Sequence, residues 1–131
     1  MIITVTMNPA IDKTVEIEKF VCRGLNRIRK VEYDAGGKGI NVAKVSSALG
    51  ESVVALGFMG GASGNFAKKQ LEELGIATSF TVIERETRTN VNISDENGIS
   101  GEILEEGPEV SAEEEKQFFA NLRKIWYTIF D

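Results

Sequence analysis

The chain has 131 residues, of which 42% are hydrophobic and 27% are charged, a balance typical of one ordinary globular domain. The formal net charge of −5 argues against general nucleic-acid binding, and no apolar run approaches the roughly 20 residues needed to span a membrane. The absence of histidine excludes a Ser-His-Asp triad and a histidine-ligated zinc. We expect no metal site. The single cysteine and the lack of a basic leader predict a cytoplasmic protein.

The first third of the chain is expected to form strands of two kinds. Residues 2–7 (IITVTM) are β-branched and apolar, which is typical of a buried strand, and the Asn-Pro pair within residues 8–13 indicates a turn. Residues 13–20 and 27–33 alternate polar and apolar side chains, which predicts strands with one exposed face. These two strands therefore suggest a small sheet separate from the buried strand.

The following elements alternate between helices and strands. Helices are predicted at residues 40–50 and 61–75, each closed by a glycine, and buried strands at residues 52–60 and 79–84. This alternation predicts an α/β fold with a parallel sheet covered by helices on both faces. Residues 87–95 and 99–106 predict a hairpin that joins the small sheet.

A last helix is predicted from residue 111 onward. Ser111 and Glu114 have the spacing of a capping box, and the acidic first turn complements the helix dipole. Residues 125–131 (IWYTIFD) are apolar and β-prone, which leaves open a strand in altered form or an unrelated segment.

The stretch DAGGKGINVAKVSSALG, residues 34–50, raises the question of a phosphate site, because a glycine run opens a helix. A P-loop is excluded, because Glu32 and Gly39 stand where that motif needs glycine and Ser or Thr. The dinucleotide fingerprint is excluded because Val42 stands at its last glycine position. The motif itself therefore does not indicate a nucleotide site.

The chemistry of the stretch still suits a ligand. Its glycines allow close approach of the backbone, and the start of a helix favours an anion. Lys38 adds a positive charge and Asn41 a hydrogen-bonding group. Sugar hydroxyls together with a phosphate would satisfy all of these groups. The alternative is a tight strand-to-helix turn with a surface lysine.

Several motifs together resemble a known family. The segments TMNPAIDKT, GLNRI, GGKGINVAKV, ALGFMGG and TRTNV follow one another over residues 1–124 as in the phosphofructokinase-B branch of the ribokinase-like carbohydrate kinases, and are most similar to 1-phosphofructokinases and tagatose-6-phosphate kinases. The resemblance implies the N-terminal half of a three-layer fold, a parallel sheet between helices. It also implies an inserted β-sheet lid at about residues 13–33 and 88–105. Residues 125–131 depart from the family.

The resemblance also implies a set of substrate-binding residues: Asp12, Asn26, Gly37, Lys38, Asn41, Arg88 and Asn90. Asp12 would bind sugar hydroxyls from a loop just past the first strand, and Gly37 and Asn41 would hydrogen-bond the sugar. Lys38 and Arg88 would hold the phosphate of the substrate, for which the paired donors of arginine are well suited. The two remaining asparagines would lie beside the site.

The activity that the resemblance implies is transfer of phosphate from ATP, with Mg²⁺, to a hydroxyl of a sugar phosphate. Fructose 1-phosphate, converted to fructose 1,6-bisphosphate, is the first candidate, and tagatose 6-phosphate is the alternative. In the family, a later Gly-Ala-Gly-Asp motif holds the catalytic base and an anion hole, and the adenine pocket is later still; this sequence has no Gly-x-Gly-Asp pattern. We therefore expect no catalytic residue here and a chain that supplies only the sugar-binding half, as a non-catalytic binding module or an inactive truncated remnant. The lid strands would join two copies of the chain.

Overall fold

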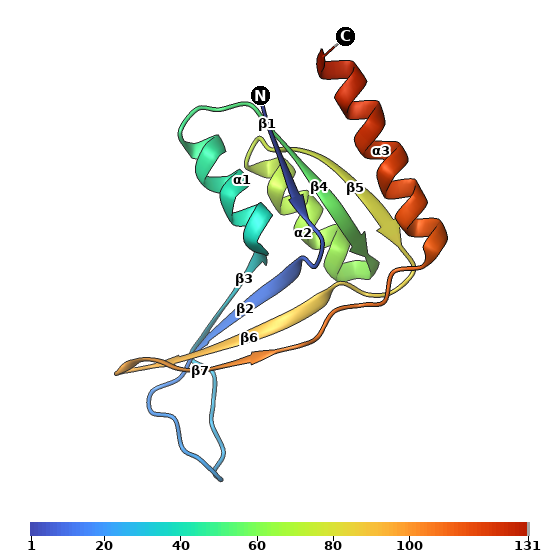
Figure 1. Ribbon diagram of the computed structural model, residues 1–131. Coiled ribbons are helices and arrows are strands. Elements are labelled where there is room, and N and C mark those ends of the chain that lie inside the picture. Colours follow the sequence, from blue (N-terminus) through green and yellow to red (C-terminus); the bar gives the residue numbers. More distant parts are fainter. Residues whose placement is uncertain (131) are drawn as a thin grey trace.

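The computed structural model describes residues 1–130, apart from the side chain of Ser100, and contains two sheets (Figure 1). The first sheet is parallel and has the strand order β1-β4-β5, formed by β1 (Ile2–Thr6), β4 (Val53–Gly60) and β5 (Ala77–Ile83). Helices α1 (Lys38–Ala48) and α2 (Gly61–Glu73) lie on one face and α3 (Ala112–Phe130) on the other. The predicted α/β architecture, a parallel sheet between helices, is confirmed.

The core divides into two clusters because alternate residues of β4 point to opposite faces. Val53, Ala55 and Met59 pack with buried residues of α1 and α2, including Ile40 and Leu71. On the other face, Leu56 and Phe58 pack against Phe118 of α3, with partly buried Leu122 and Ile125 alongside. Burial of apolar surface on both faces therefore holds the three layers together.

The second sheet is mixed and extends away from the first, as Figure 1 shows. Its order is β3-β2-β6-β7, with β2 (Ala10–Glu16), β3 (Lys30–Gly36), β6 (Arg88–Asp95) and β7 (Gly98–Leu104). β2 runs parallel to β6, whereas the pairs β2–β3 and β6–β7 are antiparallel. The small separate sheet and its hairpin are thus present, in the order that brings residues 10–16 against residues 88–94.

One sequence-based boundary was wrong at the start of the small sheet. The turn after β1 is shorter than predicted, and β2 begins at Ala10, so Asp12 lies on a strand and not in a loop. Ala10 and Ile11 are buried and pair with β3 on one side and β6 on the other. Tertiary pairing of this apolar pair therefore extends the strand toward β1.

The interpretation of the C-terminal residues as a strand was also wrong, because α3 continues to Phe130; Asp131 lies outside the described residues. Phe118, Leu122 and Ile125 repeat at helical spacing and pack on the sheet, which overrides the β-propensity of the segment. The capping box is confirmed: Ser111 Oγ accepts from the Glu114 N–H at 3.1 Å, and Glu114 Oε1 accepts from the Ser111 N–H at 2.9 Å.

Candidate functional site

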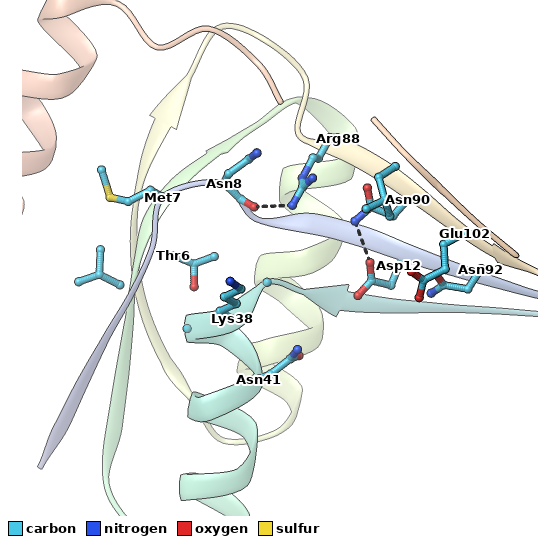
Figure 2. A pocket seen from close by; sticks show the side chains of 14 residues that line it. Thr6, Met7, Asn8, Asp12, Lys38, Asn41, Arg88, Asn90, Asn92 and Glu102 are labelled. Atoms are coloured by element: carbon cyan, nitrogen blue, oxygen red, sulfur yellow. Dashed lines mark hydrogen bonds between the residues drawn. The ribbon is translucent and has the colours of Figure 1, made fainter. Parts of the chain in front are cut away.

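A pocket of about 630 Å³ lies where β1 ends, α1 begins and the inner face of the small sheet passes over both (Figure 2). Six of the residues implied by the resemblance line it: Asp12, Gly37, Lys38, Asn41, Arg88 and Asn90. They come from β2, α1, β6 and the glycine that precedes α1, and the two that are farthest apart in the sequence are Asp12 and Asn90. The fold therefore gathers these side chains around one space.

The glycine loop forms the wall of the pocket at the start of α1. Gly37 has φ +125°, a conformation that favours glycine, and the helix begins directly after it, two residues earlier than predicted. The first helical hydrogen bond runs from the Asn41 N–H to the Gly37 carbonyl at 2.8 Å, and no side chain caps the helix. Among the described residues, the N–H groups of residues 38–40 thus remain without a partner and favour a bound anion or acceptor.

Asp12 lies at the centre of the small-sheet side of the pocket. Its Oδ1 accepts a hydrogen bond from Asn90 Nδ2 at 3.2 Å, because the two residues are direct neighbours on paired strands. A side chain on Gly36 would collide with the Asp12 carboxylate, so the glycine provides the space that the carboxylate occupies. The neighbouring carboxylate of Asp34 pairs instead with Lys44 Nζ at 2.7 Å. Asp12 keeps further acceptor capacity for donors such as sugar hydroxyls.

Arg88 crosses the opposite side of the pocket. Its Nη1 donates to the Glu105 carbonyl at 3.1 Å and its Nη2 to the Asn8 carbonyl at 3.2 Å. These bonds fix the guanidinium between two loops and use two of its five N–H donors. Its Nε is buried and has no partner among the described residues. Three of its N–H donors therefore have no partner among the described residues, and arginine donors bind phosphate through charge-assisted hydrogen bonds.

Unpartnered buried polar atoms are concentrated at this pocket. Four such side-chain atoms occur within the part of the chain that the structure describes, and three belong to residues lining the pocket: Thr6 Oγ1, Arg88 Nε and Asn90 Oδ1. A buried polar group without a partner costs about 1–3 kcal/mol, so such groups are uncommon in native proteins. Their concentration in one pocket makes it a place where ordered water or a polar ligand would supply hydrogen-bond partners.

Both signs of charge face the pocket. Lys38 and Arg88 provide positive charge near the start of α1 and the loops, and Asp12 and Glu102 provide negative charge on the small sheet. A ligand with one anionic group and several hydroxyls would match this division, because phosphate pairs with the cations and hydroxyls donate to carboxylates.

Asn26 is the implied residue that the structure does not bring to the pocket. Its side-chain amide closes the loop between β2 and β3: Oδ1 accepts from the Val21 N–H at 2.8 Å, and Nδ2 donates to the Val21 carbonyl at 2.9 Å. The side chain is occupied by its own loop, and the pocket lining does not include it. Asn26 therefore belongs to one of the quoted motifs but does not line the pocket.

Other polar side chains that line the pocket were not predicted from the sequence: Thr6, Asn8, Asn92 and Glu102. Asn92 follows Arg88 and Asn90 at the strand period of two, so the sequence contained a signal for it. Glu102 faces the pocket because it pairs with Asn92 across β6 and β7, a register interrupted by an irregularity at Ile93 and Ser94. No local pattern reveals that register.

The described residues contain no group of three Cys, Asp or Glu side chains arranged to hold a metal ion. Over the same residues, no helix is both long and apolar enough to cross a membrane.

Comparison with known proteins places these features in context. A family model described as "pfkB family carbohydrate kinase" matches residues 5–127. A tagatose-6-phosphate kinase from Staphylococcus epidermidis is 40% identical over 126 residues, which are 96% of this chain and 40% of that protein. The chain therefore spans about two fifths of the length of this curated relative.

Solved structures agree with this match. A Thermotoga maritima protein named "Possible 1-phosphofructokinase" is 39% identical, with a TM-score of 0.83 over 92% of this chain and 39% of that one. Phosphofructokinase-2 from Escherichia coli, solved in complex with fructose-6-phosphate, is 25% identical, with a TM-score of 0.88 over 94% of this chain and 41% of that one. The same E. coli protein has a tetrameric inhibited form, 26% identical, with a TM-score of 0.88 over 95% of this chain and 41% of that one.

Proposed function

The chain belongs to the pfkB family of carbohydrate kinases, and from this premise we propose that it binds a phosphorylated sugar in the pocket between β1, α1 and the small sheet. In this proposal it contributes the sugar-binding part of an ATP-dependent sugar-phosphate kinase. The observation that carries the proposal is the convergence of six implied residues and three unpartnered buried polar atoms on one pocket.

The charges of the pocket support one orientation of the ligand. The phosphate of the sugar pairs with Lys38 and Arg88, whose cationic groups are the ones that line the pocket. The hydroxyls of the sugar donate to the Asp12 carboxylate, which Asn90 holds in place from the neighbouring strand. The amide of Asn41 and the backbone at Gly37 complete the hydrogen bonds to the sugar. The small sheet then acts as a lid that covers the ligand and excludes water.

The phosphoryl donor does not fit the residues described here. The glycine loop departs from both nucleotide motifs, and no acidic cluster of the kind that holds a cation occurs among residues 1–130. We therefore derive no step through ATP or Mg²⁺ from this chain. We propose that the catalytic carboxylate and the ATP site belong to the portion of the family fold that this chain does not span.

Two ligands are the first to test. Fructose 1-phosphate is our first candidate, supported by the likeness to the T. maritima protein. Tagatose 6-phosphate is the second, supported by the 40% identity to the S. epidermidis kinase. Both are singly phosphorylated ketohexoses, the class of ligand that the charges of the pocket favour.

The experiment is thermal unfolding of the chain with and without each sugar phosphate, and separately with ATP. A ligand present at 100 times its dissociation constant should stabilise the fold by about 2.7 kcal/mol, which raises the melting temperature by several degrees. We expect a shift with one sugar phosphate and none with ATP alone. A folded chain that responds to neither sugar phosphate would refute the proposal and leave an inactive remnant as the better description.

A matched pair of variants tests the site itself. Arg88→Met removes the charge that faces the pocket, whereas Arg85→Met removes an equal charge whose partner, Glu109 at 3.5 Å, lies outside it. We expect the ligand-induced shift to be lost in the first variant and retained in the second. An equal loss in both would mean that the response depends on net charge and not on this pocket.

We also propose that two copies pair through the small sheet. Val31, Tyr33 and Ile103 lie on the face opposite Asp12 and are 41%, 47% and 61% exposed, which supports association of this apolar face. The molar mass from light scattering should be that of a dimer, and a monomer at micromolar concentration would contradict the pairing.

A further inference from the structure

Thr6 forms part of the floor of the pocket and is not among the residues that the family resemblance implied. It is the last residue of β1, and its side chain is buried, with 5% exposure. The Oγ1 hydroxyl has no hydrogen-bond partner among the described residues, although the side chain lines the pocket. The fold by itself therefore leaves a donor and acceptor unsatisfied at this point.

The orientation of this side chain is set by the glycine loop. A Cβ built on Gly37 would lie 2.5 Å from Thr6 Cγ2, and one built on Gly39 would lie 2.5 Å from Thr6 Oγ1. The methyl group thus faces Gly37 and the hydroxyl faces Gly39, and a β-branched side chain has little freedom to turn away. Two glycines therefore hold the hydroxyl beside the first turn of α1.

The first turn of α1 also has polar groups without partners among the described residues. The N–H groups of Lys38, Gly39 and Ile40 have no partner in the part of the chain that is described, and no side chain caps this 11-residue helix. The Thr6 hydroxyl lies beside this turn but bonds none of these N–H groups. Unsatisfied groups on both sides of the same space point to an oxygen atom of a ligand between them.

We propose that Thr6 is a ligand-binding residue of the pocket. Its hydroxyl donates a hydrogen bond to an oxygen of the bound sugar phosphate, and the N–H groups at the start of α1 donate to the same oxygen. This inference rests on the proposed function of the pocket. The oxygen belongs to the phosphate or to a sugar hydroxyl, since both accept hydrogen bonds from an O–H group.

The test compares Thr6→Val with Thr4→Val. Valine has nearly the shape of threonine without the hydroxyl. Thr4 lies on the same strand and is also buried, with 6% exposure and an unpartnered Oγ1, but it does not line the pocket. Each substitution removes one unsatisfied hydroxyl, so both variants should unfold at the same temperature as the wild type or higher. The two differ only in whether the hydroxyl faces the ligand.

The dissociation constant for the sugar phosphate is then measured by calorimetry for the wild type and both variants. We expect about a tenfold weaker affinity for Thr6→Val and no change for Thr4→Val. Thr6→Ser retains the hydroxyl and should bind within about threefold of the wild type. Thr6→Ala, which also lacks the hydroxyl, is measured if Thr6→Val does not fold. Inorganic phosphate and the unphosphorylated sugar, tested separately on the wild type and Thr6→Val, identify which oxygen Thr6 contacts.

Two outcomes would overturn the inference separately from the proposed function. Wild-type affinity in Thr6→Val would show that the hydroxyl does not contact the ligand, although the pocket binds it. Equal weakening in Thr4→Val and Thr6→Val would assign the effect to the strand and not to the contact. Absence of sugar-phosphate binding by the wild-type chain would instead refute the proposed function, and this inference with it.

Discussion

Replacing Gly36 by alanine should displace the carboxylate of Asp12 without removing it. The new Cβ would overlap Asp12 Oδ2, the nearest atom, and would lie 2.6 Å from Asp12 Cγ, whereas ordinary contact begins near 3.4 Å. The carboxylate carbon must therefore move by at least about 0.8 Å, and Oδ2 by more. Gly36 is not among the glycines with positive φ, so alanine is compatible with its backbone. The cost of the substitution therefore falls on the flexible end of one side chain.

The displacement should be sufficient to break the hydrogen bond between Asp12 and Asn90. Its hydrogen bond from Asn90 Nδ2 is already 3.2 Å long, near the upper limit for such bonds. A hydrogen bond to a charged group is worth about 1.5–3 kcal/mol, which corresponds to roughly 10- to 150-fold in affinity. We expect Gly36→Ala to weaken sugar-phosphate binding by at least about tenfold and to change the free energy of unfolding by less than about 1 kcal/mol.

Calorimetric titration at 25 °C, with urea unfolding of the same preparations, measures both quantities. Gly101→Ala is the matched control, because this glycine lies on β7 of the same sheet and a Cβ there would meet nothing within 4 Å. Asp12→Ala gives the loss expected when the carboxylate is absent. Wild-type affinity in Gly36→Ala, alongside a loss in Asp12→Ala, would refute the reasoning that the exact position of this carboxylate is what the ligand requires.

Two further predictions concern α3. Phe118→Ala should lower the free energy of unfolding by about 3–5 kcal/mol, because the ring is 4% exposed and packs 5.1 Å from that of Phe58 between centroids, whereas Phe119→Ala, at a residue 53% exposed, should cost less than about 1 kcal/mol. Chemical denaturation measures both, and similar costs would contradict the assignment of the core. Hydrogen bonds from the N–H groups of Ser111 and Glu84 lower the pKa of Glu114 below its ordinary 4.5, so its contribution to stability is present above pH 4.5 and is lost as the pH falls below that value. Glu114→Gln should accordingly lose less stability than the wild type between pH 6 and pH 3, and parallel pH profiles would argue against this capping role.

The architecture could largely be predicted from local patterns. The alternation of apolar strands with helices closed by Gly50 and Gly75 indicated a parallel sheet covered on both faces, and the amphipathic segments indicated a separate sheet. Two of the errors, at Ala10 and after Lys124, have one cause. In both places burial against a neighbouring element decides the local structure, and propensity contributes too little energy to oppose it.

The residues of the candidate site were predictable to a different degree. The glycine loop and Arg88 belong to recognisable motifs, and they line the pocket. Asn26 belongs to a motif as well, yet its amide is used to close a loop. Thr6 and Glu102 carry no signal in the sequence that separates them from any buried threonine or exposed glutamate.

The amino-acid sequence by itself determined the order and type of the elements, because hydrophobic period, capping residues and glycine positions act over a few residues. It also determined which chemical groups were available, including the cations of Lys38 and Arg88 and the carboxylate of Asp12. Only the tertiary structure decided which groups meet. The pairing of β2 with β6 brings Asp12 beside Asn90, and the packing of β1 against the glycine loop leaves the Thr6 hydroxyl unsatisfied. Strand order and register depend on the burial of the whole chain, so no local segment contains them.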